Sequence, residues 1–96
     1  VELVAANPAH IYGMRQKGSL HPGKDADIVL LDPRAQWTMG QANSHSSNDW
    51  HAYEGWEITG RITQVYSRGE LLIDGDKCVV AKGRGRYIHR TLPETI

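Results

Sequence analysis

The sequence predicts a mainly β fold that is preceded by one or two short helices. Helical patterning ends near Met14, whereas from Ser19 onward short apolar, β-branched runs alternate with Gly, Pro and Asp turn signals. The clearest run is IVLL at residues 28–31, which is too short for a helix and begins with β-branched residues. These observations predict a small sheet with helices only at its beginning.

The first residues predict helical turns. Residues 1–6 (VELVAA) place Glu2 on one side of an apolar segment, as in an amphipathic helix, and no capping residue precedes them. We expect a second short helix to start at Asn7-Pro8, because Asn can accept hydrogen bonds from free N–H groups and Pro suits the first helical position. Gly13 should end this helix. The uncapped beginning at Val1, which is not a Met, predicts that the chain is a fragment.

Residues 28–31 predict a strand that is apolar on both faces. Pro22-Gly23 before it and Asp32-Pro33 after it should set its limits, because Gly tolerates positive φ and Pro disfavours helix in the preceding residue. Such a strand needs a covering layer on each side.

The rest of the chain predicts a long polar loop and two hairpins. The loop lies between Trp37 and Trp56, and loops of this length are commonly functional or packed against a partner. The hairpins should turn at Ser67-Arg68-Gly69 and at Asp74-Gly75, where Gly supplies positive φ. The expected strands lie near residues 28–32, 58–66, 69–73 and 78–81.

Composition limits the function classes. With 96 residues, of which 40% are hydrophobic, the chain can form one small domain with a thin core. Eleven basic and eleven acidic residues cancel, which argues against a nucleic acid or an acidic membrane as the main partner. No apolar stretch approaches the roughly 20 residues that span a bilayer. The single cysteine, Cys78, cannot form an internal disulfide, so we expect a cytoplasmic protein. Cys78 lies in a strand pattern, KCVV, without CxxC spacing, so we expect it to be a buried structural thiol.

Three groups of polar residues are candidates for chemistry. His45, Asp49 and His51 are of types that bind zinc, but they lie in a loop and we expect them to face solvent. Asp25 and Asp27 form a carboxylate pair, which we expect to accept hydrogen bonds from backbone N–H groups at the start of the strand.

The third group consists of isolated histidines and a basic tail. His10, His21 and His89 have no carboxylate or nucleophile at a catalytic spacing. The tail surrounds Tyr87 with basic residues, which we interpret as an exposed segment that contacts a partner, since one aromatic residue is too few to indicate a nucleic-acid site. Its basic residues are Lys82, Arg84, Arg86 and Arg90. We therefore assign no catalytic, cofactor-binding or metal-binding residue to this chain.

Four segments together resemble one family. In chain order they are VELVAANPAHIYGM, KGSLHPGKDADIVLLDP, YEGWEITGRITQVYSRGELLIDG and GRGRYIHR. They resemble the C-terminal end of the cyclic amidohydrolases, most closely the dihydropyrimidinase/hydantoinase group. Allantoinases and dihydroorotases more often have a Ser-Pro-aromatic sequence where this chain has HAYEGW.

The resemblance implies a fold and a division of the chain. Members of the family combine a (β/α)₈ barrel with a β-sandwich built from both chain ends. By resemblance, residues 1–16 are the terminal helices beside a barrel that is absent here. Residues 17–96 are then the C-terminal portion of the sandwich, with a polar loop at 37–57 and a basic tail at 82–96. The apolar strand would join strands from elsewhere in the full enzyme.

The resemblance also implies a chemistry and partners. Family members hydrolyse cyclic amide bonds with two divalent metal ions, usually zinc, whose ligands would all lie upstream of Val1. The fragment alone is then inactive, and its partners are the rest of the chain and further subunits of a dimer or tetramer. Two alternatives remain open: an allantoinase, dihydroorotase or other amidohydrolase, and a non-catalytic homologue with a structural or interaction role.

Overall fold

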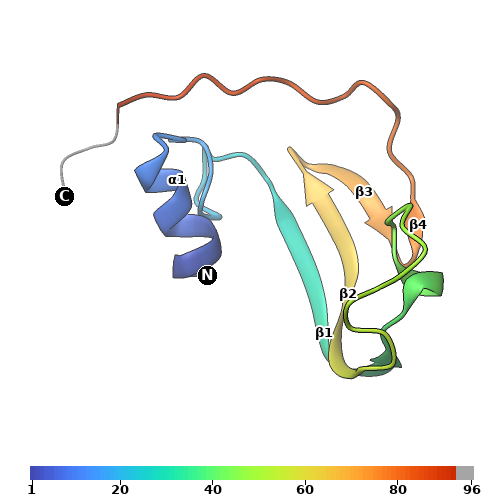
Figure 1. Ribbon diagram of the computed structural model, residues 1–96. Coiled ribbons are helices and arrows are strands. Elements are labelled where there is room, and N and C mark those ends of the chain that lie inside the picture. The colour runs from blue at the N-terminus through green and yellow to red at the C-terminus, as the bar shows by residue number, and fades with distance from the viewer. Residues whose placement is uncertain (93–96) are drawn as a thin grey trace.

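A four-stranded antiparallel sheet and a short helical segment lie side by side and are bridged by the end of the chain (Figure 1). The computed structural model describes residues 1–92. The Cα radius of gyration is 16.1 Å, whereas a compact domain of this length has about 12 to 13 Å. The chain is therefore extended, with the helical segment and the sheet as two separate parts connected by the tail.

The helical segment runs without interruption from a π-helical turn, η1 (Glu2–Ala6), into α1 (Asn7–Ile11). Pro8 explains the wide turn, because its ring excludes a normal bond to the carbonyl four residues earlier. The N–H groups of Ala6 and Asn7 instead bond to the carbonyls five residues before them. The predicted start of a second short helix at Asn7-Pro8 is confirmed, because α1 begins at Asn7. The predicted cap is wrong, since Asn7 has helical dihedral angles and no side-chain capping bond, and α1 follows η1 directly. Gly13, at φ 67°, ends the segment as predicted.

The sheet has the order β1-β2-β3-β4, and every neighbouring pair is antiparallel. All four predicted strands are present, with different limits for the first and the last. The strands are β1 (Ile28–Thr38), β2 (Glu57–Ser67), β3 (Glu70–Asp74) and β4 (Lys77–Cys78).

Strand β1 continues past Asp32-Pro33, where the sequence predicted its end. The pairing with β2 shifts between Asp32, opposite Arg61, and Gln36, opposite Thr59. This irregularity accommodates Pro33, which has no N–H to give to the ladder. Trp37 then donates its indole N–H to the carbonyl of Gly60 at 3.0 Å, which ties the far half of β1 to β2.

Both predicted hairpins form. Arg68 (φ 49°) and Gly69 (φ 77°) make the two-residue loop between β2 and β3, and two positive φ angles are those of a type I′ turn. Gly75, at φ 62°, begins the loop between β3 and β4.

Residues 1–92 contain no buried apolar side chain, so the described residues have no core of their own where the sequence predicted a thin one. Val29 and Leu31 of β1 are 56% and 60% exposed, and the covering layers that this strand was predicted to need do not come from residues 1–92. Cys78 is exposed on β4, which overturns the prediction of a buried thiol. Its strand is only two residues long and lies at the sheet edge, where nothing in the described chain covers it.

Candidate functional site

The start of β1 is held by a salt-bridge cluster. Lys17 Nζ lies 2.5 Å from Asp27 Oδ2 and 2.9 Å from Asp25 Oδ2. The two aspartates thus serve the structural role predicted for them. Asp27 accepts a backbone N–H, from Arg68, as expected, and the Lys17 side chain is a shared partner of both aspartates that was not expected.

The cluster shifts the pKa of two of its members. Burial disfavours the charged form of Asp27, but hydrogen bonds from Lys17 and from the Arg68 N–H outweigh this effect and hold the pKa of Asp27 below its usual value. In the same way burial lowers the pKa of Lys17, while its hydrogen bonds to Asp27 and Asp25 reverse the effect and raise that pKa. The cluster therefore stabilises the charged forms, which favours a structural role over proton transfer near neutral pH.

The β2–β3 turn connects this cluster to the tail. On one side, the Arg68 N–H donates to Asp27 Oδ1 at 2.9 Å and the Gly69 N–H donates to the Ala26 carbonyl at 3.0 Å. On the other side, Arg84 Nε lies 2.6 Å from Glu70 Oε2, and its Nη2 donates to the carbonyl of Ser67 at 2.8 Å. One tight turn thus fixes both the start of β1 and the start of the tail.

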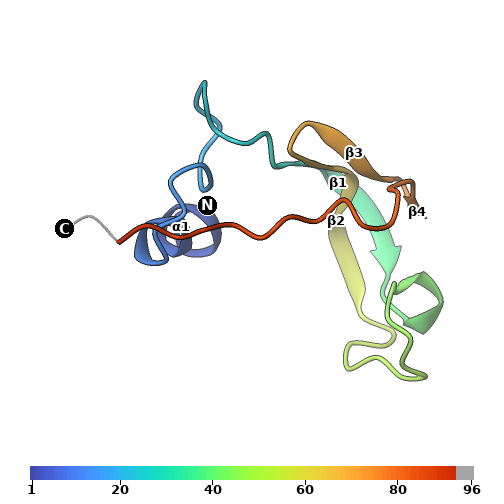
Figure 2. The same cartoon turned by 90° about the horizontal axis from the view of Figure 1, so that it is seen from above.

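The tail ends on the helical segment. Thr91 donates from its backbone N–H and its hydroxyl to the carbonyl of Gly13, at 3.0 and 3.1 Å, and Arg15 Nε donates to the same hydroxyl at 3.1 Å. Between Arg84 and Thr91 the tail runs extended from the sheet to α1, as both views show (Figure 2). A pocket of about 410 Å³ lies at this junction, and its lining includes His10, Met14 and Lys24.

The loop at residues 39–56 lies at the opposite end of β1 and β2. Its base is ordered: Met39 exchanges backbone hydrogen bonds with Trp56 and Gly55, each 2.8 Å long, and Glu54 Oε2 accepts the Gln41 N–H at 2.8 Å. A short 3₁₀ turn, η2 (Gln41–Asn43), follows.

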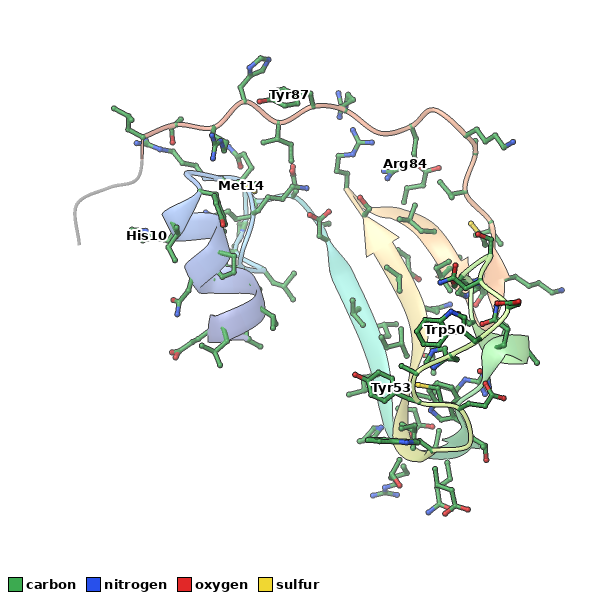
Figure 3. The ribbon with its side chains drawn as sticks, in the orientation of Figure 1. His10, Met14, Trp50, Tyr53, Arg84 and Tyr87 are labelled. Atoms are coloured by element: carbon green, nitrogen blue, oxygen red, sulfur yellow. The ribbon has the colours of Figure 1, made fainter. Side chains whose placement is uncertain are left out.

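The loop also presents aromatic side chains to solvent. Trp50, Tyr53 and Trp56 are 67%, 51% and 59% exposed, and the rings of Tyr53 and Trp56 pack edge to face at 5.0 Å. Figure 3 shows Trp50 and Tyr53 on the loop beside the sheet. Tyr87, on the tail, is 80% exposed, so Trp50, Tyr53, Trp56 and Tyr87 are all more than half exposed.

No metal centre fits the described residues. His45 and Asp49 are exposed, and His51 Nδ1 accepts the backbone N–H of Tyr53 at 3.1 Å. Across residues 1–92, no group of three or more His, Cys, Asp or Glu side chains is placed to hold a metal ion. The two metal ions implied by the family resemblance thus have no ligand set in this part of the chain.

The structure adds residues that the sequence analysis did not single out. Lys17, Arg15 and Thr91 make anchoring contacts, and Gly13 lies so close to the tail that an added Cβ would be 1.8 Å from the Thr91 carbonyl oxygen. Among the features that anchor this end, only the hairpin turn had a local sequence signal, the Ser67-Arg68-Gly69 segment. No local pattern links Gly13 to Thr91, because the two are far apart in sequence.

These contacts describe a four-stranded sheet that is anchored at one end and open on its faces. The chain belongs to the amidohydrolase family: the profile of the Amidohydrolase family matches residues 1–72. No helix within residues 1–92 is long and apolar enough to cross a membrane.

The chain is similar to hydantoinases and dihydroorotases over most of its length. It is 41% identical to the D-hydantoinase of Streptomyces coelicolor over 91 residues, which are 94% of this chain and 20% of that protein. It is 34% identical to the dihydroorotase of Pyrococcus horikoshii over 88 residues, 92% of this chain and 21% of that protein. The solved structure of D-hydantoinase from Bacillus sp. AR9 matches with a TM-score of 0.90 at 34% identity, covering 96% of this chain and 20% of that chain. The chain therefore spans about a fifth of the length of these relatives.

Proposed function

We propose that this chain is the non-catalytic C-terminal part of a metal-dependent cyclic amidohydrolase that opens the rings of hydantoins and dihydropyrimidines. The observation that carries the proposal is the 41% identity to a D-hydantoinase over 94% of this chain, which spans only 20% of that protein. The TM-score of 0.90 to a second D-hydantoinase supports the same assignment.

Within that enzyme we assign the chain a structural role. Residues 1–16 belong to helices beside the barrel, and residues 17–96 to the sandwich, with a polar loop at 37–57 and a basic tail at 82–96. The last four residues of this tail lie outside the described residues. The exposed apolar side chains of β1 support this role, because a strand with this composition gains free energy when the rest of a domain covers it.

The chemistry is assigned to the remaining four-fifths of the protein. In this proposal no residue of this chain has a catalytic, cofactor-binding or metal-binding role. We propose zinc as the metal, further copies of the protein as partners in a dimer or tetramer, and a cytoplasmic location.

A dihydroorotase is the second candidate, favoured by the 34% identity to the protein from Pyrococcus horikoshii. The HAYEGW segment, at residues 51–56, favours the hydantoinase side. A non-catalytic homologue is the third reading, and it depends on residues outside this chain.

The test compares the full-length protein with the 96-residue chain. We expect the full-length protein to hold about two metal ions per subunit and to hydrolyse hydantoin or dihydrouracil, while the chain alone does neither. Hydrolysis of dihydroorotate alone would favour the second candidate. A full-length protein without metal or ring hydrolysis would support the non-catalytic reading, and stoichiometric metal on the 96-residue chain would contradict the assignment of chemistry to the rest of the protein.

A further inference from the structure

The helical segment and the sheet do not contact each other directly. No Cα atom of η1 or α1 lies within 8 Å of a Cα atom of β1, β2, β3 or β4. Two stretches of chain join the two parts: residues 12–27, which lead into β1, and the tail, which returns from β4 to the helical segment (Figures 1 and 2). A single connection can act as a pivot, so the second connection decides whether the two parts can turn against each other.

The first connection is closed on itself. The Asp25 N–H donates to the Gln16 carbonyl at 2.9 Å, and the Lys24 ammonium group donates to the carbonyl of Arg15. These bonds shorten the connection. Both lie within residues 12–27, so they do not by themselves fix the angle between the helical segment and the sheet.

The second connection, the tail, is fixed to the sheet by two arginines. Arg84 Nη2 donates to the carbonyl of Ser67 at 2.8 Å, and Arg68 Nη2 donates to the carbonyl of Arg84. Each arginine thus bonds to the backbone at or beside the other, in addition to the ion pair of Arg84 with Glu70. The bond to the tail also accounts for an arginine at φ 49°, a turn position where glycine or asparagine is usual.

Between Arg84 and Thr91 the tail has no hydrogen bond to the rest of residues 1–92. The edge-to-face contact of the Tyr87 and His89 rings, at 5.0 Å, is internal to this stretch. The stretch runs extended (Figure 2), and an extended chain spans at most about 3.3–3.6 Å per residue. The bonds at its two ends therefore limit how far the helical segment can move away from the sheet.

The same arrangement occurs in a longer relative. The solved D-hydantoinase chain described above matches 96% of this chain with a TM-score of 0.90. A match this close over this share of the chain includes the helical segment, the sheet and the tail. The tail therefore takes this course within a single chain that also contains the rest of an enzyme.

We propose that residues 84–91, which we call the strap, lock the helical segment and the sheet in one orientation, and that the two anchors of the strap act together. When the Arg84 anchor opens, Thr91 is held only through the longer stretch that begins at Cys78, where β4 ends. Closing a loop of about twice the length is about 3-fold less favourable. Release at the sheet should therefore weaken the contact of Thr91 with Gly13, although no bond joins Arg84 to Thr91.

The strap goes beyond the proposed function, because it rests on contacts within this chain. One consequence for the whole enzyme is that the sandwich keeps a fixed position beside the barrel. That consequence alone rests on the division of the chain in the proposed function.

The test measures amide hydrogen exchange of the full-length protein at Thr91, whose N–H bonds to the Gly13 carbonyl. In Arg84→Ala the protection of this N–H should fall about 3-fold. Arg86→Ala, which changes a neighbouring exposed arginine, should leave it unchanged. The Met39 N–H, which bonds to the Trp56 carbonyl at the other end of the sheet, should keep its protection in both variants and so reports an intact sheet.

An insertion tests the length of the strap without changing either anchor. About eight Gly and Ser residues between Tyr87 and Ile88 double its length, so the protection at Thr91 should again fall about 3-fold. This variant decides the question if Arg84→Ala disturbs the sheet. Unchanged protection at Thr91 in the insertion variant would overturn the proposal, and so would equal losses in Arg84→Ala and Arg86→Ala.

The orientation is measured by the distance between spin labels on non-natural amino acids at Glu2 and Lys77, which are exposed on the helical segment and on β4. Labelled subunits are diluted with unlabelled ones, so that only distances within one chain contribute. We expect one narrow distance distribution in the wild type and a broader one in the insertion variant. Equal widths would show that other parts of the protein set the orientation, which would overturn the strap. Ring hydrolysis by the wild type tests the proposed function separately.

Discussion

The two ends of the sheet differ in how their polar groups are used. At the end near α1, the cluster of Lys17, Asp25 and Asp27, the Arg68-Gly69 turn and the two ends of the tail bind one another. At the other end, the loop at residues 39–56 is ordered at its base, but its aromatic rings remain open. We call these the anchored end and the open end. One end therefore fixes the shape of this chain, whereas the other is suited to contact a partner.

Gly13→Ala should disrupt the anchored end most strongly. Alanine at φ 67° costs about 1–2 kcal/mol by itself, and its Cβ would also lie 1.8 Å from the Thr91 carbonyl oxygen, so the tail must move away. Amide hydrogen exchange of the full-length protein should show lost protection at Thr91. Gly23→Ala is the matched control, because Gly23 has φ 89° but nothing within 4 Å of an added Cβ. Equal effects of the two substitutions would contradict the close contact.

Arg84→Ala should loosen the other end of the tail by a smaller amount. The substitution removes the ion pair with Glu70 and the bond to the Ser67 carbonyl, and we expect a loss of about 1 kcal/mol because Glu70 is partly exposed. Exchange protection in the β2–β3 hairpin measures this loss. Arg86→Ala removes a nearby exposed arginine that has no such contacts, and it should leave the hairpin unchanged. A similar loss in both variants would mean that general charge, and not these contacts, holds the tail.

Acid should weaken the anchored end through Asp27. Its pKa in the folded chain lies below the usual value of 3.8, so its stabilising contribution is complete above pH 3.8 and is lost as the pH falls through the folded pKa. Lys17 behaves in the opposite sense: its raised pKa gives a contribution that is complete below pH 10.5 and is lost as the pH rises through the folded pKa. The Arg68 N–H bonds to Asp27 Oδ1, so its exchange protection, corrected for the intrinsic rate, reports the acid limb.

In Asp27→Asn, the exchange protection of the Arg68 N–H should no longer fall as the pH is lowered. In Asp49→Asn, which changes an exposed carboxyl of the open end, this loss of protection at low pH should be the same as in the wild type. If the wild type and Asp27→Asn lose protection at the same pH, the salt-bridge cluster does not hold the turn.

Sequence patterns predicted the elements of this fold better than the contacts among them. Local signals were sufficient for the Arg68-Gly69 turn and for the end of the helix at Gly13, since positive φ is a property of a few neighbouring residues. They were insufficient for Asp32-Pro33, where pairing with β2 carries the strand past a residue that usually ends one. The burial of Cys78 was predicted wrongly, because its apolar neighbours indicate a strand but not what covers it.

The candidate surfaces followed from composition, whereas the anchors did not. A polar loop with uncovered Trp residues and a basic tail can be recognised without coordinates, because exposure follows from the surrounding polar residues. The pairing of Lys17 with Asp27, and of Thr91 with Gly13, depends on how distant segments pack, and one sequence carries no signal for it. Interpretation of the open end as a contact surface therefore stays a prediction.

Trp50→Ala should have the smallest effect on the chain itself. The indole is 67% exposed and takes part in no ring contact or hydrogen bond of the described residues, so its removal should change local stability by no more than about 0.5 kcal/mol. In an assembled protein the same side chain would be buried at a contact, and its removal should then lower the oligomer size seen by light scattering. Leu20→Ala, which removes a side chain that is 70% exposed outside both surfaces, is the control. An unchanged oligomer for Trp50→Ala and for Trp56→Ala would show that the open end is exposed in the assembly too, and the contrast between the two ends would then concern folding alone.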